Sequence, residues 1–332
     1  MAQRIIMIHG RSTKPCKAQF AHLQKTALLQ GLNRISSSKS AKVADGRVPV
    51  DFVYYGDINN QILAKADKVA AKALTVTDPH SDDAHCIPAT GYAEAIAALA
   101  KFNRFDKAAY RRVVKNNKDM RFIDDAARAV STLAAILTGA NLNRFAIEKA
   151  TADMGAYLMR RSIGSAIRER LQDPLRNALK RRDDICLVSH SMGCMVAYDV
   201  LWKFSRMSEY SDLRAGSAKV NRWVTLGCPL GEAGVKANLC DANEYQFPGG
   251  TDKHPKGIVG DWLNVAAVDD FISHDATMKN DYSAMLKHKY VNSITDISIY
   301  NCFTFEGKSN PHKLFGYLAN PKCATTIADW IK

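Results

Sequence analysis

A serine lies where a buried strand is expected to give way to a helix. The stretch ICLVSHSMGCMVAYDVL, residues 185–201, runs from an apolar, branched segment through Ser191 into residues with helical spacing. A serine at such a strand-to-helix turn has the geometry of a nucleophile elbow. A capped helix start would give a similar pattern, so the turn alone leaves that alternative open. The chemistry indicated is attack by a serine hydroxyl whose proton is taken up by a nearby base.

The residues on either side of this serine are small. A nucleophile elbow needs small residues two positions before and two positions after the serine, because strand and helix approach closely there. Here these are Ser189 and Gly193. The usual pattern is G-x-S-x-G, so the sequence departs from it at Ser189, and we expect the elbow to be kept but to be tighter. The Met192 N–H lies at the positive start of the following helix, where it can stabilise an oxyanion.

Three motifs together resemble the α/β-hydrolase superfamily, particularly its lipase and esterase branches. They are SHSMG after a buried strand, HG at His9 and Gly10 after an earlier strand, and TLGCPL after the following strand. The resemblance covers the chain outside residues 58–182 and implies an α/β fold with a mostly parallel, hydrolase-type sheet. It also implies a triad in the chain order serine, acid, histidine, each after its own strand. We expect His9 to order its loop rather than to act in catalysis.

The histidine implied by the resemblance is His312, in SNPHKLFGYL after the last expected strand. His274 and His288 precede that strand and are the alternatives, and a purely structural role for His312 at a helix start is another. The acid follows the strand DWLNVAAV, where Asp269 and Asp270 are adjacent. Counting along WLNVAAVDD favours Asp270, and leaves Asp269 to be solvated or to cap the next helix.

These residue types suit acyl transfer. His312 would accept the Ser191 proton, and Asp270 would hold the imidazole in the correct tautomer and stabilise its charged form. By the resemblance, the second oxyanion donor comes from the loop after the first strand, at Gly10 or Arg11. The interpretation is a serine esterase or lipase, with phospholipase as a variant, that acts on a small-molecule or lipid ester. No metal and no organic cofactor is expected.

An alternation of strands and helices must position these groups. Branched apolar runs predict six strands, and amphipathic runs between them predict the crossover helices of a parallel sheet. The strands are expected at residues 4–10, 48–56, 184–190, 221–229, 261–268 and 296–303. Helices of the core are expected at residues 17–32, 192–207 and 312–331.

A large helical insertion interrupts this alternation. It takes up residues 58–182, between the core segments 1–57 and 183–332, and by the resemblance it forms a lid over the nucleophile. Alanine-rich stretches within it predict helices at 61–74, 92–114, 122–138, 143–162 and 164–181.

The helical insertion is also strongly basic. The chain has a formal net charge of +13, and residues 101–182, with 19 Lys or Arg against 8 Asp or Glu, carry +11 of it. Such a surface could meet anionic lipid, with Leu133, Ile136 and Leu137 offering an apolar face, or could simply be solvated. The basic clusters lie at 111–118, 160–161, 168–170 and 180–182.

Composition excludes several classes of protein. With 47% hydrophobic and 24% charged residues among 332, the chain is neither disordered nor collagen-like. The apolar stretch at the N-terminus is too short for a Sec-type signal, and residues 129–140 are too short to cross a bilayer, so we expect a cytoplasmic protein, peripheral at a membrane in the lipase case. The eight cysteines lack CxxC or Cys/His ligand spacing, and we expect them to be reduced and not to bind zinc.

Other functions use the same sequence features. An acyltransferase would employ the same triad, because it differs only in whether water or an alcohol reaches the acyl-enzyme. A catalytically silent hydrolase-like scaffold would use the insertion to bind a partner. Nucleic-acid binding would suit the charge, but the sequence has no recognised module, aromatic stacking repeat or zinc-finger spacing. It also has no P-loop or G-x-G-x-x-G turn, which argues against nucleotide enzymes.

Overall fold

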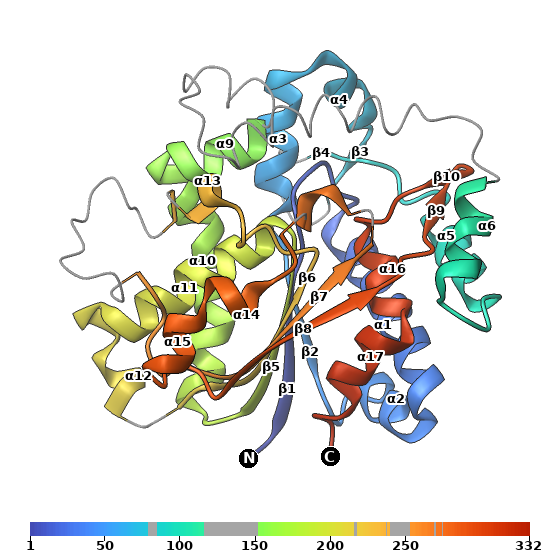
Figure 1. Ribbon diagram of the computed structural model, residues 1–332. Helices are drawn as coiled ribbons and strands as arrows, with labels where there is room; N and C mark the ends of the chain where they lie inside the picture. The colour runs from blue at the N-terminus through green and yellow to red at the C-terminus, as the bar shows by residue number, and fades with distance from the viewer. Residues whose placement is uncertain are drawn as a thin grey trace.

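The computed structural model shows an α/β architecture with one central sheet between helices (Figure 1). Six strands form the sheet in the order β2-β1-β5-β6-β7-β8, and every neighbouring pair is parallel. The six strands expected from the apolar runs are therefore confirmed. Their bounds are β1 Gln3–Ile8, β2 Val50–Val53, β5 Asp184–His190, β6 Val220–Leu226, β7 Val259–Ala267 and β8 Ser293–Ile299.

Part of the chain is not described by this structure. The residues described are 1–78, 85–115, 152–215, 218–236, 238–239, 253–268, 270–273 and 275–332. Several sequence predictions lie outside these ranges. They are the helix at 122–138, the first part of the helix at 143–162, and the residues Leu133, Ile136, Leu137, Asp269 and His274.

Helices cover both faces of the sheet. In Figure 1, α1, α2, α16 and α17 lie on one side of the strands, and α10, α11 and α12 lie on the other. Successive side chains of a strand point to opposite faces. On β5, Leu187 therefore packs into the core with α10 and α11, whereas Val188 packs into the core with α1, α16 and α17. Burial on both faces explains why these strands are apolar runs rather than alternating ones.

The helices of the described residues fall into two groups. Those before β5 are α1 Lys17–Ile35, α2 Ser37–Ala44, α3 Gly56–Ala66, α4 Lys68–Ala73, α5 Tyr92–Ala100, α6 Lys107–Lys115, α9 Ala152–Met159 and α10 Arg161–Lys180. Those after it are α11 Met192–Arg206, α12 Ser211–Ala215, α13 Ala233–Lys236, α14 Met278–Asp281, α15 Ser283–Lys287, α16 Leu314–Ala319 and α17 Pro321–Ala328. Single 3₁₀ turns occur at Ser208–Tyr210 and Phe271–Ser273. Two short antiparallel pairs complete the elements: β3 Val76–Thr77 with β4 His85–Cys86, and β9 Thr304–Phe305 with β10 Lys308–Ser309.

The last helix of the helical insertion packs on the sheet itself. Leu171, Leu175 and Ala178 of α10 are fully buried in the same core as the strands, and α10 contacts β1, β2 and α11. In Figure 1, α3, α4 and α9 lie at the end of the sheet where the strands finish. A lid function for residues 58–182 stays a prediction.

The expectation of fully reduced cysteines is wrong for one pair. Cys16, which directly precedes α1, forms a disulfide with Cys86 of β4, 70 residues along the chain. Such a pair has no short-range spacing, so the sequence pattern did not reveal it. The other cysteines described, Cys186, Cys194, Cys228, Cys302 and Cys323, are free and buried. Within the described ranges, every helix is too short or too polar to cross a membrane.

Candidate active site

Ser191 occupies the turn between β5 and α11 in a left-handed backbone conformation, with φ 53° and ψ −126°. Its N–H donates to the carbonyl of Leu226 at the end of β6 (3.0 Å), and its own carbonyl accepts from the Cys194 N–H (2.8 Å). A sparsely populated backbone conformation costs about 1–3 kcal/mol and persists only where the surroundings hold it. These hydrogen bonds hold the turn, which is the geometry expected of an elbow.

Glycine is required at two positions around the serine. A Cβ on Gly193 would overlap the carbonyl oxygen of His9, so α11 can approach the end of β1 only without a side chain there. A Cβ on Gly10 would lie 2.6 Å from the Ser191 Cβ and 2.9 Å from His190 Nδ1. The loop after β1 therefore lies directly against the serine at the carboxyl edge of the sheet.

Ser189 has a hydrogen-bonding role that explains the departure from glycine at the first small position. Its hydroxyl accepts from Trp223 Nε1 at 2.9 Å and lies 3.4 Å from Cys194 Sγ, and all three side chains are buried. A buried indole N–H without a partner would cost about 1–3 kcal/mol. Serine thus fits the close approach of strand and helix and also satisfies the neighbouring tryptophan.

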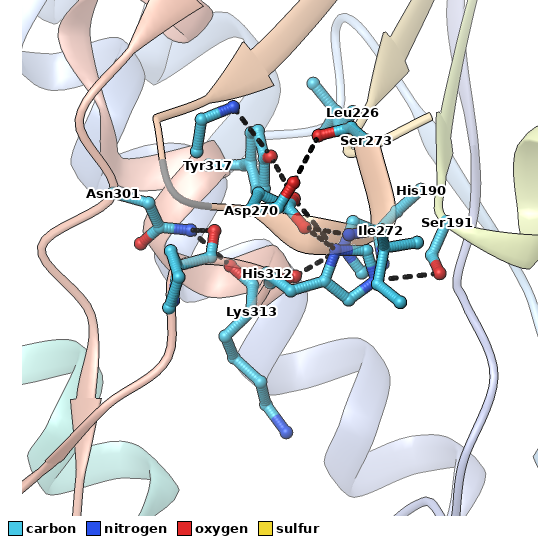
Figure 2. Close-up of polar contacts among 12 residues, drawn as sticks. His190, Ser191, Leu226, Asp270, Ile272, Ser273, Asn301, His312, Lys313 and Tyr317 are labelled. Atoms are coloured by element: carbon cyan, nitrogen blue, oxygen red, sulfur yellow. Dashed lines mark hydrogen bonds and ion pairs between the residues drawn. The ribbon is translucent and has the colours of Figure 1, made fainter. Parts of the chain in front are cut away.

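The structure brings the three predicted triad residues into one hydrogen-bonded chain (Figure 2). His312 Nε2 lies 2.8 Å from Ser191 Oγ, and His312 Nδ1 lies 2.9 Å from both carboxylate oxygens of Asp270. Because a carboxylate only accepts, Nδ1 carries the proton toward Asp270, and Nε2 is left to accept from the serine hydroxyl. This is the arrangement that lets an imidazole act as a base toward the serine.

Two further donors orient the Asp270 carboxylate. The Tyr317 hydroxyl of α16 donates to Asp270 Oδ2 at 2.5 Å, and the Ile272 N–H donates to Oδ1 at 3.0 Å. The Tyr317 oxygen in turn accepts from the Ala267 N–H at the end of β7 (2.9 Å). Burial, followed by the charge of Asp270, raises the pKa of Tyr317 well above its ordinary value, so this hydroxyl remains a donor. Sequence reasoning missed Tyr317, because nothing local in FGYL shows which side chain its hydroxyl meets.

Asn301 holds the loop that carries His312. Its Nδ2 donates to the carbonyls of Pro311 (2.8 Å) and Lys313 (3.0 Å), the two residues that flank the histidine. Its Oδ1 accepts from the Phe303 N–H at 3.1 Å. Asn301 is fully buried just beyond β8, so the imidazole is positioned by a rigid clamp and not only by its own contacts.

Two buried histidines flank the site without joining the triad. His190 Nε2 donates to the His312 carbonyl (2.8 Å), and burial, then the nearby His312, lowers the pKa of His190 well below its ordinary value. The Tyr55 N–H donates to His9 Nε2 (3.1 Å), which places the His9 proton on Nδ1, where it is donated to the Gly10 carbonyl (2.8 Å). Both rings are therefore neutral and hold the backbone, as expected for His9.

A buried carboxylate from the helical insertion fixes the loop after β1. Asp153 of α9 accepts from the Ser12 N–H at 2.6 Å and from the Arg11 guanidinium at 3.0 and 3.1 Å. Burial alone would raise the pKa of Asp153, but the charge of Arg11 and the N–H of Ser12 outweigh it and hold the pKa below its ordinary value. Ser12 itself has φ 76°, so its strained backbone depends on this contact. A charged residue in the apolar stretch ADMGAYLM was the one sequence signal for such a pair.

The predicted oxyanion donors lie around the serine. Met192 is the first residue of α11, where a helix has no internal acceptor for its N–H. Gly10 and Arg11 line a cleft of about 130 Å³ beside Ser191. The role of these three N–H groups stays a prediction. The cleft is lined by His9, Gly10, Arg11, Ser12, Thr13, Lys14, Pro15, Phe20, Tyr92, His190, Ser191, Asn310, His312, Lys313, Leu314 and Phe315.

Other predicted residues lie elsewhere. His288 directly follows α15, is exposed and has its ring beside Tyr290. Asp269 and His274 are outside the described residues. Arg168, expected on a basic surface of the helical insertion, is instead buried and lies 3.6 Å from Asp199, so it cannot face a lipid surface.

No three His, Cys, Asp or Glu side chains within the described ranges come close enough together to hold a metal ion. Comparisons with protein-family models, with curated proteins and with solved structures gave no match to this chain. The functional assignment therefore depends on the geometry of the site.

Proposed function

We propose that this chain is a serine hydrolase of the α/β-hydrolase type that cleaves carboxylic esters. The observation that carries the proposal is the position of His312, hydrogen-bonded at one ring nitrogen to Ser191 and at the other to Asp270. The strained turn that presents Ser191 between a central parallel strand and a buried helix supports the same conclusion. A serine that merely capped α11 would need neither the imidazole nor the carboxylate.

The proposed reaction has two halves, acylation of Ser191 and hydrolysis of the acyl-enzyme. Ser191 Oγ attacks the ester carbonyl carbon while its proton passes to His312 Nε2, and the Asp270 carboxylate stabilises the imidazolium that forms. The tetrahedral intermediate collapses, the bond from carbon to the alcohol oxygen breaks, and the alcohol leaves with the proton from Nε2. Water then attacks the acyl-enzyme with His312 again as base, which releases the acid and restores the serine.

The developing oxyanion is assigned to backbone donors. The Met192 N–H at the start of α11 supplies one, aided by the positive end of the helix. The second comes from Gly10 or Arg11, whose loop is pressed against Ser191. Losing one such donor typically lowers kcat by about 10²–10³-fold.

The deciding experiment is labelling with a fluorophosphonate probe, with the adduct located by peptide mass spectrometry. We expect the wild type and Ser283→Ala, a control at an exposed serine of α15, to be labelled at Ser191 and to hydrolyse p-nitrophenyl esters. Ser191→Ala should lose both the label and the turnover while keeping its circular dichroism spectrum. Turnover that survives in Ser191→Ala, or a folded wild type that takes no label and cleaves no ester, would contradict the proposal.

A further inference from the structure

The cleft beside Ser191 is cationic. Three basic side chains, Arg11, Lys14 and Lys313, line it, and among the described residues no aspartate or glutamate does. Arg11 is neutralised by Asp153, which lies behind the loop. For the ammonium groups of Lys14 and Lys313, no carboxylate oxygen lies within 4.0 Å in the part of the chain that the structure describes.

Lys313 is held in place by aromatic side chains, without a carboxylate partner among the described residues. Its ammonium lies 3.2 Å from the Tyr92 hydroxyl, 4.5 Å from the centre of the Tyr92 ring and 5.8 Å from that of Phe315. Its carbonyl is clamped by Asn301, directly after the catalytic His312. Aromatic faces attract an ammonium but leave its charge able to act on a ligand. The position next to His312 places that charge beside the reacting ester.

Lys14 adds a second basic side chain, a buried one, to the same wall. Its ammonium donates to the Ser12 carbonyl at 3.0 Å and to the Arg11 carbonyl, both in the loop after β1. Burial, followed by repulsion from Lys313, lowers the pKa of Lys14 well below its ordinary value. An anion in the cleft would offset this repulsion and would favour the charged form of Lys14.

We propose that the ester substrate carries an anionic group, a carboxylate or a phosphate, that binds against Lys313 with Lys14 behind it. This inference rests on the proposed function, because it names the substrate class for the same site. The small volume of the cleft, about 130 Å³ against the roughly 300–1,000 Å³ of typical ligand pockets, suits a compact charged group rather than a long acyl chain. The aromatic side chains Phe20, Tyr92 and Phe315 would contact the short apolar part of such a substrate.

The first test compares two esters that differ in charge and by one methyl group. They are p-nitrophenyl hemisuccinate, which has a free carboxylate, and its methyl ester, which is neutral. We expect wild-type kcat/KM to favour the anionic ester by about tenfold or more, and the preference to fall as salt screens the charges. A second pair, a short-chain lysophosphatidic acid against the monoacylglycerol with the same short chain, places the anion on the alcohol side. The pair with the larger preference locates the anionic group.

For each variant we compare the ratio of kcat/KM for the anionic ester to kcat/KM for the neutral ester. A general loss of activity lowers both values and leaves this ratio unchanged. Lys313→Met keeps the length of the side chain and should lower the ratio tenfold or more, and Lys313→Glu should reverse the preference. Lys25→Met removes a lysine of α1 that lies beside Ala44, away from the cleft, and should leave the ratio unchanged. Ratios near one for both pairs in an active wild type would refute the proposal of an anionic substrate. They would leave the proposal of a serine hydrolase unaffected.

A binding measurement keeps the inference testable if no ester is cleaved. Calorimetric titration of Ser191→Ala with monomethyl succinate and with inorganic phosphate should show binding that Lys313→Met in the same background removes. Binding of neither anion, or equal binding with and without Lys313, would refute the anion site whatever the outcome of the labelling experiment.

Discussion

The substitution Asp153→Asn tests whether Asp153 positions the loop after β1 for the reaction, in addition to stabilising the fold. The Asp153 side chain is fully buried and binds Ser12 and Arg11, whereas asparagine keeps the volume but loses the charge and one acceptor oxygen. Breaking a buried ion pair by removing one partner costs about 3–5 kcal/mol. We expect asparagine, which retains one acceptor, to lower the free energy of unfolding by about 3 kcal/mol.

The same change should slow the reaction. Without Asp153, the strained backbone at Ser12 relaxes, and the N–H of Gly10 or Arg11 moves from its place beside Ser191. Because loss of a whole oxyanion donor costs about 10²–10³-fold, a displaced loop should lower kcat by about 10–100-fold. A donor that acts in the transition state affects kcat, so the KM for p-nitrophenyl butyrate should change little.

Asp183→Asn provides the matched control. Asp183 is also a buried aspartate bound by arginines, Arg4 and Arg181, but it lies just before β5, at the opposite end of that strand from Ser191. Urea unfolding and steady-state kinetics should show a similar loss of stability in both variants and a loss of kcat only in Asp153→Asn. Equal kcat in the two variants would refute the claim that Asp153 positions the catalytic loop.

Two further predictions follow from groups around the triad. Tyr317→Phe removes a hydrogen bond to the buried Asp270 carboxylate, so urea unfolding should show a free energy of unfolding lower by about 1.5–3 kcal/mol. The kcat for ester turnover should fall as well. An unchanged kcat would show that Asp270 needs no such support. Burial lowers the pKa values of His9 and His190 from an ordinary 6.5 in the unfolded chain. As the pH falls below 6.5, the unfolded chain therefore binds protons that the folded protein does not, and the stability present above pH 6.5 is lost. Between pH 6.5 and 5.5 these two histidines should together lower the free energy of unfolding by about 2 kcal/mol. Equal free energies of unfolding at the two pH values, measured with urea, would contradict the assignment of both rings as neutral.

Much of the sheet could be predicted because burial leaves a direct mark on sequence. Strands covered on both faces must be apolar runs, and all six were visible as such. Boundaries were less well predicted where a capping residue or proline breaks a helical pattern. The helix expected at 312–331 is two helices, because Asn320 caps a new one that starts at Pro321.

The candidate site was predictable only where its residues follow strands. Ser191, Asp270 and His312 each come after a strand of the parallel sheet, so topology brings them together. The groups that orient them could not be found this way. Tyr317 and Asp153 act through contacts between distant segments, and neither strand order nor local spacing encodes which side chains meet.

The hydrogen bond between Trp223 and Ser189 makes the elbow optically observable. Trp223 stacks on Trp262 with ring centres 4.5 Å apart, and both indoles are fully buried. Ser189 is two residues from Ser191, so a change in the turn on acylation would alter the polar contact of the indole N–H. The intrinsic fluorescence of this protein should therefore follow formation and decay of an acyl-enzyme in a stopped-flow experiment, with no attached dye.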